Sequence, residues 1–287
     1  MAPEAFKQWI NKRPTDNHSV VALGTGLNYI PHTPDTVIRE CVARDCAVLL
    51  FSLTHDNKQN AEMTPEMLLD MMQDVREEAT KHAIDARIDN RVLITHSLPG
   101  LITQLDEESD WNRIVSHGPP YEVTPFYRNK WTRSAIRGLG RLGVPIYIWN
   151  ENFPGEDYLA KTRMHRFVPP QIYDASLMSK DRLQEQCLPK DGPPTLVIHD
   201  PLDSVSCHDG TRELMERSDL SEQWQFQSIT RTSTKEDLVN HHDTTDPKML
   251  GKWAKRVNKA RNGFLKLLKN PRMNPQKLSL GSLHRSV

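Results

Sequence analysis

The residue best placed for nucleophilic chemistry in this sequence is Ser97, which stands between a short apolar run and a segment with helical spacing. Residues 92–95 follow a turn signal and predict a short buried strand, and the apolar residues of 101–105 predict a helix. A serine at a sharp strand-to-helix turn points its hydroxyl out of the carboxyl edge of a sheet, and the next backbone N–H, on Leu98, can face a developing oxyanion. The other interpretation is a serine that only begins a helix.

The turn itself departs from the usual G-x-S-x-G pattern, because residues 95–99 read T-H-S-L-P. Both glycines are replaced, although Gly100 follows one position later. Pro99 would lie in the first turn of the helix, where its missing N–H costs little. We expect His96 to pack or to face a substrate rather than to take part in the chemistry.

A glycine-rich loop follows an earlier predicted strand, at residues 24–28. Such a loop can cradle a phosphate or present backbone N–H groups to an oxyanion. It does not read G-x-G-x-x-G and no lysine follows it, so the pattern does not favour nucleotide binding.

The elements around Ser97 alternate between strands and helices. Apolar runs predict strands at 19–23 and 47–51, and Thr33-Pro34 and Thr64-Pro65 are helix start signals. This alternation predicts a mostly parallel sheet flanked by helices. Before it, we expect residues 2–18 to hold one or two helical turns. After Ser97, strands are predicted at 113–116, 144–149, 195–199 and 224–229.

The composition is that of an ordinary globular chain, with 37% hydrophobic and 26% charged residues among 287. No apolar run approaches a membrane span and no secretory segment is recognisable, so we expect a cytoplasmic protein without a transmembrane segment. The four cysteines lack C-x-x-C spacing and are expected to be reduced thiols. No cluster of His, Cys, Asp or Glu has metal-ligand spacing, so we expect no metal and no cofactor. No nucleic-acid partner is expected.

The charge is zero overall but unevenly placed, because eleven Lys/Arg and no acidic residue follow from Lys248 onward. The preceding body carries 26 basic and 37 acidic residues, a net charge of −11. A helix with an apolar stripe is predicted over 246–269, and we expect the stripe to pack on the sheet. The alternative is a surface helix that binds a membrane surface or another anionic partner. Residues 270–287 are expected to be a disordered basic tail.

Taken together, residues 20–268 resemble the α/β-hydrolase fold. The serine comes first, then the stretch H-D-P-L-D at 199–203, which resembles the H-G-x-x-D after that fold's seventh strand, and then Asn240-His241, which resembles the G-H of its histidine loop. The resemblance implies a triad of Ser97, Asp203 and His241, with His242 as the fallback base.

The loop L-G-T-G at 23–26 resembles the family's H-G loop, which would supply a second oxyanion N–H from Thr25 or Gly26, besides that of Leu98. Asp200 is the rival acid, and Glu151 and Asp157 are further carboxylates to consider. His199, at the end of a buried strand, is expected to be a hydrogen-bonded core residue.

The resemblance implies a serine hydrolase that cleaves a carboxylic ester or thioester through an acyl-enzyme, with a small-molecule acyl substrate. Two other functions stay open: an acyltransferase on the same triad, and a binding protein whose triad has decayed. The core would comprise residues 19–118 and 191–269. Residues 119–190, rich in aromatics and proline, would form an inserted cap that lines an apolar acyl pocket.

Overall fold

The structure is a computed structural model that describes residues 4–12, 19–26, 35–147, 167–201, 203 and 205–228. Five predicted features lie outside the described residues: His241 with His242, Glu151, Asp157, the basic helix over 246–269, and the tail 270–287. The part of the chain that is described contains no helix with the length and apolar content needed to cross a bilayer.

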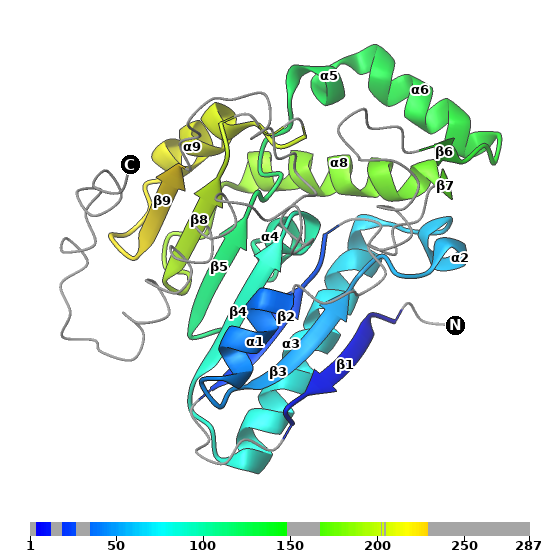
Figure 1. Cartoon of the computed structure of the whole chain (residues 1–287). Helices are drawn as coiled ribbons and strands as arrows, with labels where there is room; N and C mark the ends of the chain where they lie inside the picture. The colour runs from blue at the N-terminus through cyan, green and yellow to red at the C-terminus, as the bar shows by residue number, and fades with distance from the viewer. Residues whose placement is uncertain are drawn as a thin grey trace, which may run out of the picture.

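A seven-stranded sheet forms the centre of the molecule, in the order β1-β3-β2-β4-β5-β8-β9 (Figure 1). All neighbouring strands are parallel except β1, which pairs antiparallel with β3. The predicted class, a mostly parallel sheet flanked by helices, is therefore confirmed. The strands are β1 Phe6–Ile10, β2 Val20–Gly24, β3 Ala47–Ser52, β4 Arg91–His96, β5 Arg113–His117, β8 Thr195–His199 and β9 Trp224–Ser228.

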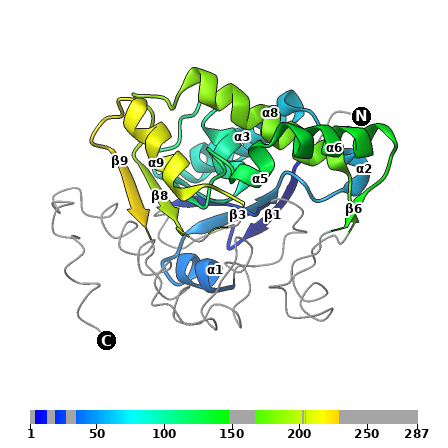
Figure 2. The ribbon, with the colours of Figure 1, turned by 90° about the horizontal axis from the view of Figure 1, so that it is seen from above.

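The central strands are apolar along their whole length because both faces of the sheet are covered. Successive residues of β3 alternate between two apolar clusters: Leu49 and Phe51 belong to one, Val48 and Leu50 to the other. Figure 2 shows α1 on one side of the sheet and α3, α8 and α9 on the other. Burial on both faces thus explains why these strands read as continuous apolar runs.

The helices begin at signals that the sequence carries. At the start of α3 the Thr64 hydroxyl accepts the Met67 N–H at 3.2 Å, and Pro65 follows, as predicted. The helices are α1 Asp35–Val42, α2 Asn57–Asn60, α3 Pro65–Ala86, α4 Leu98–Thr103, α5 Pro125–Arg128, α6 Lys130–Arg141, α8 Pro170–Gln186 and α9 His208–Arg217.

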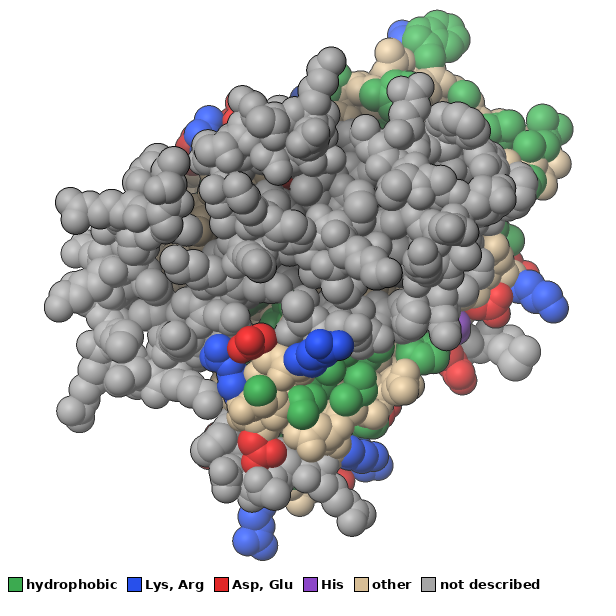
Figure 3. All heavy atoms as spheres, in the orientation of Figure 1, with side chains coloured by type: hydrophobic (Ala, Val, Ile, Leu, Met, Phe, Trp, Pro, Cys, Tyr) green, Lys and Arg blue, Asp and Glu red, His purple; other side chains and the backbone are tan. Residues whose placement is uncertain are grey.

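The segment between β5 and β8 lies beyond the carboxyl ends of β4, β5 and β8 (Figure 1). Helix α8 packs on α3 and α4, and its Ile172 and Leu183 belong to the same apolar cluster as the buried residues of α3. Helix α6 packs on α8 and stands farther from the sheet. Hydrophobic side chains show on that rim of the molecule (Figure 3).

Two local predictions are wrong. Residues 6–10 form strand β1 rather than helical turns, because pairing with the edge of β3 satisfies backbone groups that one helical turn would leave open. The strand predicted at 144–149 reduces to β6, Ile146–Tyr147, which pairs with β7, Phe167–Val168, in a separate two-stranded sheet. A short apolar run does not reveal which partner it will find.

Candidate active site

Ser97 occupies the strand-to-helix turn that its sequence context predicts. It links β4 to α4 with φ 62° and ψ −125°, a conformation that costs free energy for any residue with a Cβ. The turn is fixed on both sides: the Ser97 N–H donates to the His117 carbonyl at 2.9 Å, and its own carbonyl accepts the Gly100 N–H at 3.0 Å. Such a strained, well-anchored backbone is a hallmark of functional sites.

Gly100 explains how the turn forms without the two usual glycines. A Cβ on Gly100 would lie 2.9 Å from Thr95 Oγ1 and 3.0 Å from Ser116 Oγ. Thr95 occupies the position of the first missing glycine, and its hydroxyl is hydrogen-bonded to Ser116 Oγ at 3.0 Å. The side chain added at Thr95 is therefore accommodated by the side chain absent at Gly100.

The predicted oxyanion donors differ in their availability. The Thr25 N–H donates to the Phe51 carbonyl at 3.1 Å, so this N–H is already engaged in the sheet. Gly26 approaches the serine closely, since a Cβ there would lie 3.2 Å from Ser97 Cβ and 2.8 Å from His96 Nδ1. Leu98 begins α4, where an N–H has no acceptor within the helix. The geometry therefore favours Gly26 and Leu98 over Thr25.

Asp203 lies in the loop after β8 with its carboxylate held in place. Its Oδ1 accepts the N–H groups of Val205 at 2.8 Å and Ser206 at 2.9 Å, and its own N–H donates to the Asp200 carbonyl at 3.1 Å. Burial, and then the negative charge of Asp203, raise the pKa of Tyr127 on α5. The carboxylate is thus fixed by its own loop and faces the segment that carries α5.

Ser97 and Asp203 come from strand ends that are one strand apart. The Ser97 N–H bonds to the end of β5, and the Gly118 N–H bonds in turn to the Ile198 carbonyl of β8 at 2.8 Å. The axes of β4 and β8 are therefore about 10 Å apart, twice the spacing of neighbouring strands. This separation leaves room for an imidazole between the two side chains. His241 and His242, outside the described residues, remain predictions.

The neighbouring His199 has the core role expected of it. Its side chain is fully buried, with Nε2 2.8 Å from Ser206 Oγ and Nδ1 3.1 Å from the Asp200 carbonyl oxygen. The Ser206 hydroxyl also lies 2.7 Å from the Pro119 carbonyl. His199 therefore ties the Asp203 loop to the segment after β5.

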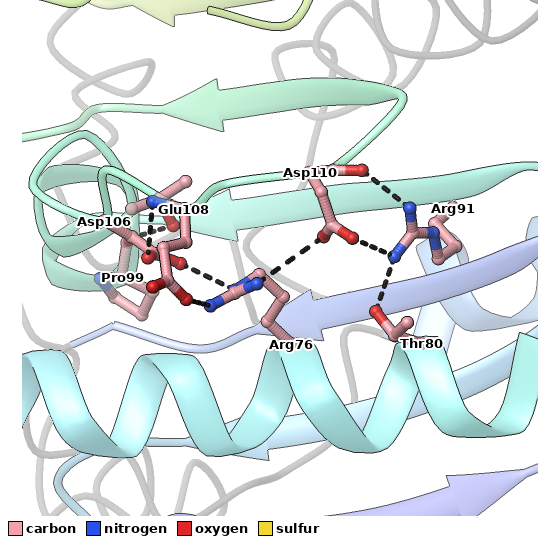
Figure 4. Close-up of polar contacts among 8 residues, drawn as sticks. Arg76, Thr80, Arg91, Pro99, Asp106, Glu108 and Asp110 are labelled. Atoms are coloured by element: carbon pink, nitrogen blue, oxygen red, sulfur yellow. Dashed lines mark hydrogen bonds and ion pairs between the residues drawn. The ribbon is translucent and has the colours of Figure 1, made fainter.

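A charged cluster anchors the far end of the elbow helix (Figure 4). Arg76 of α3 pairs through Nε with the Asp106 carboxylate at 2.9 Å and through Nη2 with Glu108 at 3.1 Å. The Asp106 side chain is only 1% exposed, and burial raises its pKa although the Arg76 charge acts in the opposite direction. Arg91 joins the cluster through Asp110 at 2.6 Å. The cluster fixes α4 and the loop after it against α3.

A second Ser-His-Asp hydrogen-bond chain, which the sequence did not suggest, lies at the end of β9. His208 Nδ1 is 2.8 Å from Asp209 Oδ1, and His208 Nε2 is 2.6 Å from Ser228 Oγ. Since an ionised carboxylate only accepts, Nδ1 carries the proton and Nε2 accepts the Ser228 hydroxyl. The hydrogen bond from His208 lowers the pKa of Asp209. Ser228 ends a regular strand and lacks the strained turn found at Ser97.

The described residues include no group of three or more His, Cys, Asp or Glu side chains placed to hold a metal ion. The side chains assembled at the carboxyl edge of the sheet are instead hydroxyl, carboxylate and imidazole groups, the types used in acyl transfer.

No protein-family model and no curated protein sequence matches this chain. Solved structures do match it. A soluble variant of monoglyceride lipase from Saccharomyces cerevisiae, in complex with a substrate analogue, is 12% identical with a TM-score of 0.70, and the match covers 91% of each chain.

A monoacylglycerol lipase from Paleococcus ferrophilus is 15% identical with a TM-score of 0.65, covering 91% of this chain and 98% of that one. The alpha/beta hydrolase domain-containing protein 10 from mouse is 10% identical with a TM-score of 0.53, covering 91% and 94%. The chain therefore has the α/β-hydrolase fold. At these identities the similarity extends to the fold alone.

Proposed function

We propose that this protein is a serine hydrolase that cleaves a carboxylic ester through an acyl-enzyme, with Ser97 as nucleophile. The observation that carries the proposal is the strained Ser97 turn, closed on one side by Gly26. A fold alone does not specify a function, but a strained serine at the carboxyl edge of this sheet is a site with a chemistry of its own.

In the proposed reaction Ser97 Oγ attacks the ester carbonyl carbon while its proton passes to His241. The N–H groups of Leu98 and Gly26 stabilise the oxyanion, and each such donor contributes about 10²–10³ in rate. The alcohol leaves with the proton from His241, and water then releases the acid by the same steps in reverse. Asp203 orients the imidazole and stabilises its charged form.

Several observations support an ester of a lipid-like acyl group as the substrate. Two of the similar structures are named as monoglyceride or monoacylglycerol lipases. The segment over 119–190 would form the cap, with α5 and α6 above the Ser97 edge and Tyr127 facing Asp203. A thioester, or an alcohol in place of water as acyl acceptor, would require the same groups.

Labelling with a fluorophosphonate, followed by peptide mapping, tests the nucleophile. We expect the label on Ser97, lost in Ser97→Ala and kept in Ser228→Ala, the matched control. A label on Ser228 that disappears in His208→Gln would instead assign the chemistry to the second hydrogen-bond chain. Wild-type protein that neither labels nor cleaves short p-nitrophenyl esters would favour the decayed binding protein.

The same assay assigns the other two groups. Asp203→Asn should lower the rate of ester cleavage with little change in stability, because the amide still accepts the two loop N–H groups. His241→Gln should abolish cleavage while His242→Gln retains it, and the opposite result would make His242 the base. Adding an alcohol acceptor and measuring the ester product against free acid distinguishes acyl transfer from hydrolysis.

A further inference from the structure

The rim formed by α5, α6 and the residues after them exposes an unusual amount of apolar surface. Phe126 is 66% exposed, Trp131 74%, Leu142 77% and Val144 43%. These are four of the seven large hydrophobic residues that are exposed in the described part of the chain, and they fall within nineteen positions. Figure 3 shows hydrophobic side chains projecting from this rim. Concentrated apolar exposure of this kind marks an interaction surface.

The exposed residues of α6 lie on one face of the helix. Trp131 and Leu142 are eleven positions apart, and at 100° per residue they differ by only about 20° in direction and about 16 Å along the axis. The opposite face packs on α8: Ile136 is buried, Arg133 pairs with Asp181, and Arg137 Nε lies 2.8 Å from Asp174 Oδ1. Helix α6 is therefore held from behind, with its apolar edge directed outward.

The charge around this face has one sign. Residues 123–150 contain five Lys/Arg and no Asp/Glu. Arg133 and Arg137 are neutralised by α8, whereas neither Lys130 nor Arg141 has a carboxylate partner among the described residues. Lys130 Nζ lies 5.7 Å from the centre of the Trp131 ring, and Arg141 is next to Leu142 in sequence. Each end of the apolar face thus carries a cation beside a large hydrophobic side chain.

We propose that this face docks on an anionic lipid bilayer, with α6 lying in the plane of the interface. The apolar side chains would enter the boundary between headgroups and acyl chains, and Lys130 and Arg141 would contact lipid phosphates. Tryptophan suits this boundary because its ring is apolar and its N–H is polar. The cations identify an anionic membrane rather than a second copy of this chain, whose body is itself acidic but whose corresponding face is basic.

The face is connected to the candidate active site. At the start of α5 the Thr124 N–H donates to the Val205 carbonyl at 3.0 Å, two residues beyond Asp203. Docking would place the carboxyl edge of the sheet near the bilayer, from which a lipid ester could enter. The binding proposal itself holds whether or not Ser97 is a nucleophile.

Vesicle sedimentation with the full chain tests the proposal. We expect binding to vesicles of phosphatidylcholine with phosphatidylserine and much weaker binding to phosphatidylcholine alone. Lys130→Gln with Arg141→Gln should reduce partitioning by about tenfold or more, since each cation near an anionic surface contributes about fivefold. Trp131→Ala with Leu142→Ala should reduce it at least as much. Ile84→Ala, which removes an apolar residue of 71% exposure elsewhere on the molecule, is the matched control.

Two outcomes would overturn the proposal. Binding that both double variants leave unchanged would assign it to another surface, such as the basic segment after Lys248. Absence of binding by folded wild-type protein, or a dimer that Trp131→Ala dissociates, would identify a different occupant. Brominated lipids supply an independent readout, because they should quench a fluorescence component that is absent from Trp131→Phe.

Discussion

The backbone at Ser97 makes a prediction about stability that does not depend on activity. At φ 62° and ψ −125° any side chain is strained, at a cost of about 1–3 kcal/mol. Glycine adopts this region freely, so Ser97→Gly relieves the strain and Ser97→Ala keeps it. Both changes remove the hydroxyl, and the difference between the two variants therefore isolates the backbone term.

The expected difference follows from three contributions. Taking strain as about 2 kcal/mol, we subtract about 0.5–1 kcal/mol for the greater freedom of glycine in the unfolded chain and part of about 0.8 kcal/mol for one buried methyl group. The glycine variant should thus exceed the alanine variant by about 1 kcal/mol in free energy of unfolding. For a domain of this size that corresponds to about 2–4 °C in Tm.

Urea and thermal unfolding of both variants measure this difference. Ser52 supplies the control, since it is a fully buried serine in β3 with no positive φ. There the order should reverse, with glycine less stable than alanine. If Ser97→Gly is no more stable than Ser97→Ala, the turn is not strained and the argument for an elbow at this serine fails.

Three other changes test the surroundings of the serine. Gly100→Ala should cost about 1–3 kcal/mol in unfolding free energy by overpacking, and Thr95→Ala in the same chain should recover part of it, which a double-mutant cycle measures. Gly26→Ala should lower kcat for an ester about 10²–10³-fold with a smaller change in KM, if its N–H stabilises the oxyanion. Arg76→Met should cost about 3–5 kcal/mol at pH 7, because it leaves the buried Asp106 carboxylate without its cation. The raised pKa of Asp106 would rise further in that variant, so the folded state would hold a proton that the unfolded state lacks, and the deficit should shrink as the pH falls toward 4; a deficit independent of pH would contradict this.

Much of the fold could be predicted from the sequence alone because its signals are local. Continuous apolar runs give β3, β4 and β8, and a threonine followed by proline gives the start of α3. The position of Ser97 between a strand and a helix is local in the same sense. Strand order and parallel pairing followed from the alternation of these elements.

Other features depended on contacts between residues far apart in the chain. Strand β1 exists because residues 6–10 find the edge of β3, and the Thr25 N–H is engaged because it meets Phe51. The exchange of space between Thr95 and Gly100 could not be read from a pattern that lacked both expected glycines. Likewise, His208 and Ser228 are twenty residues apart, with no spacing that signals their hydrogen bond.

The difference has a physical reason. Propensity, capping and apolar periodicity act over a few residues, so the sequence by itself determined where strands and helices form and that Ser97 sits between two of them. Which N–H remains available, which side chain fills a gap, and which helix face stays exposed are decided by packing between elements. The outward face of α6 is such a case, because only the packing of its other side on α8 leaves Trp131 and Leu142 exposed.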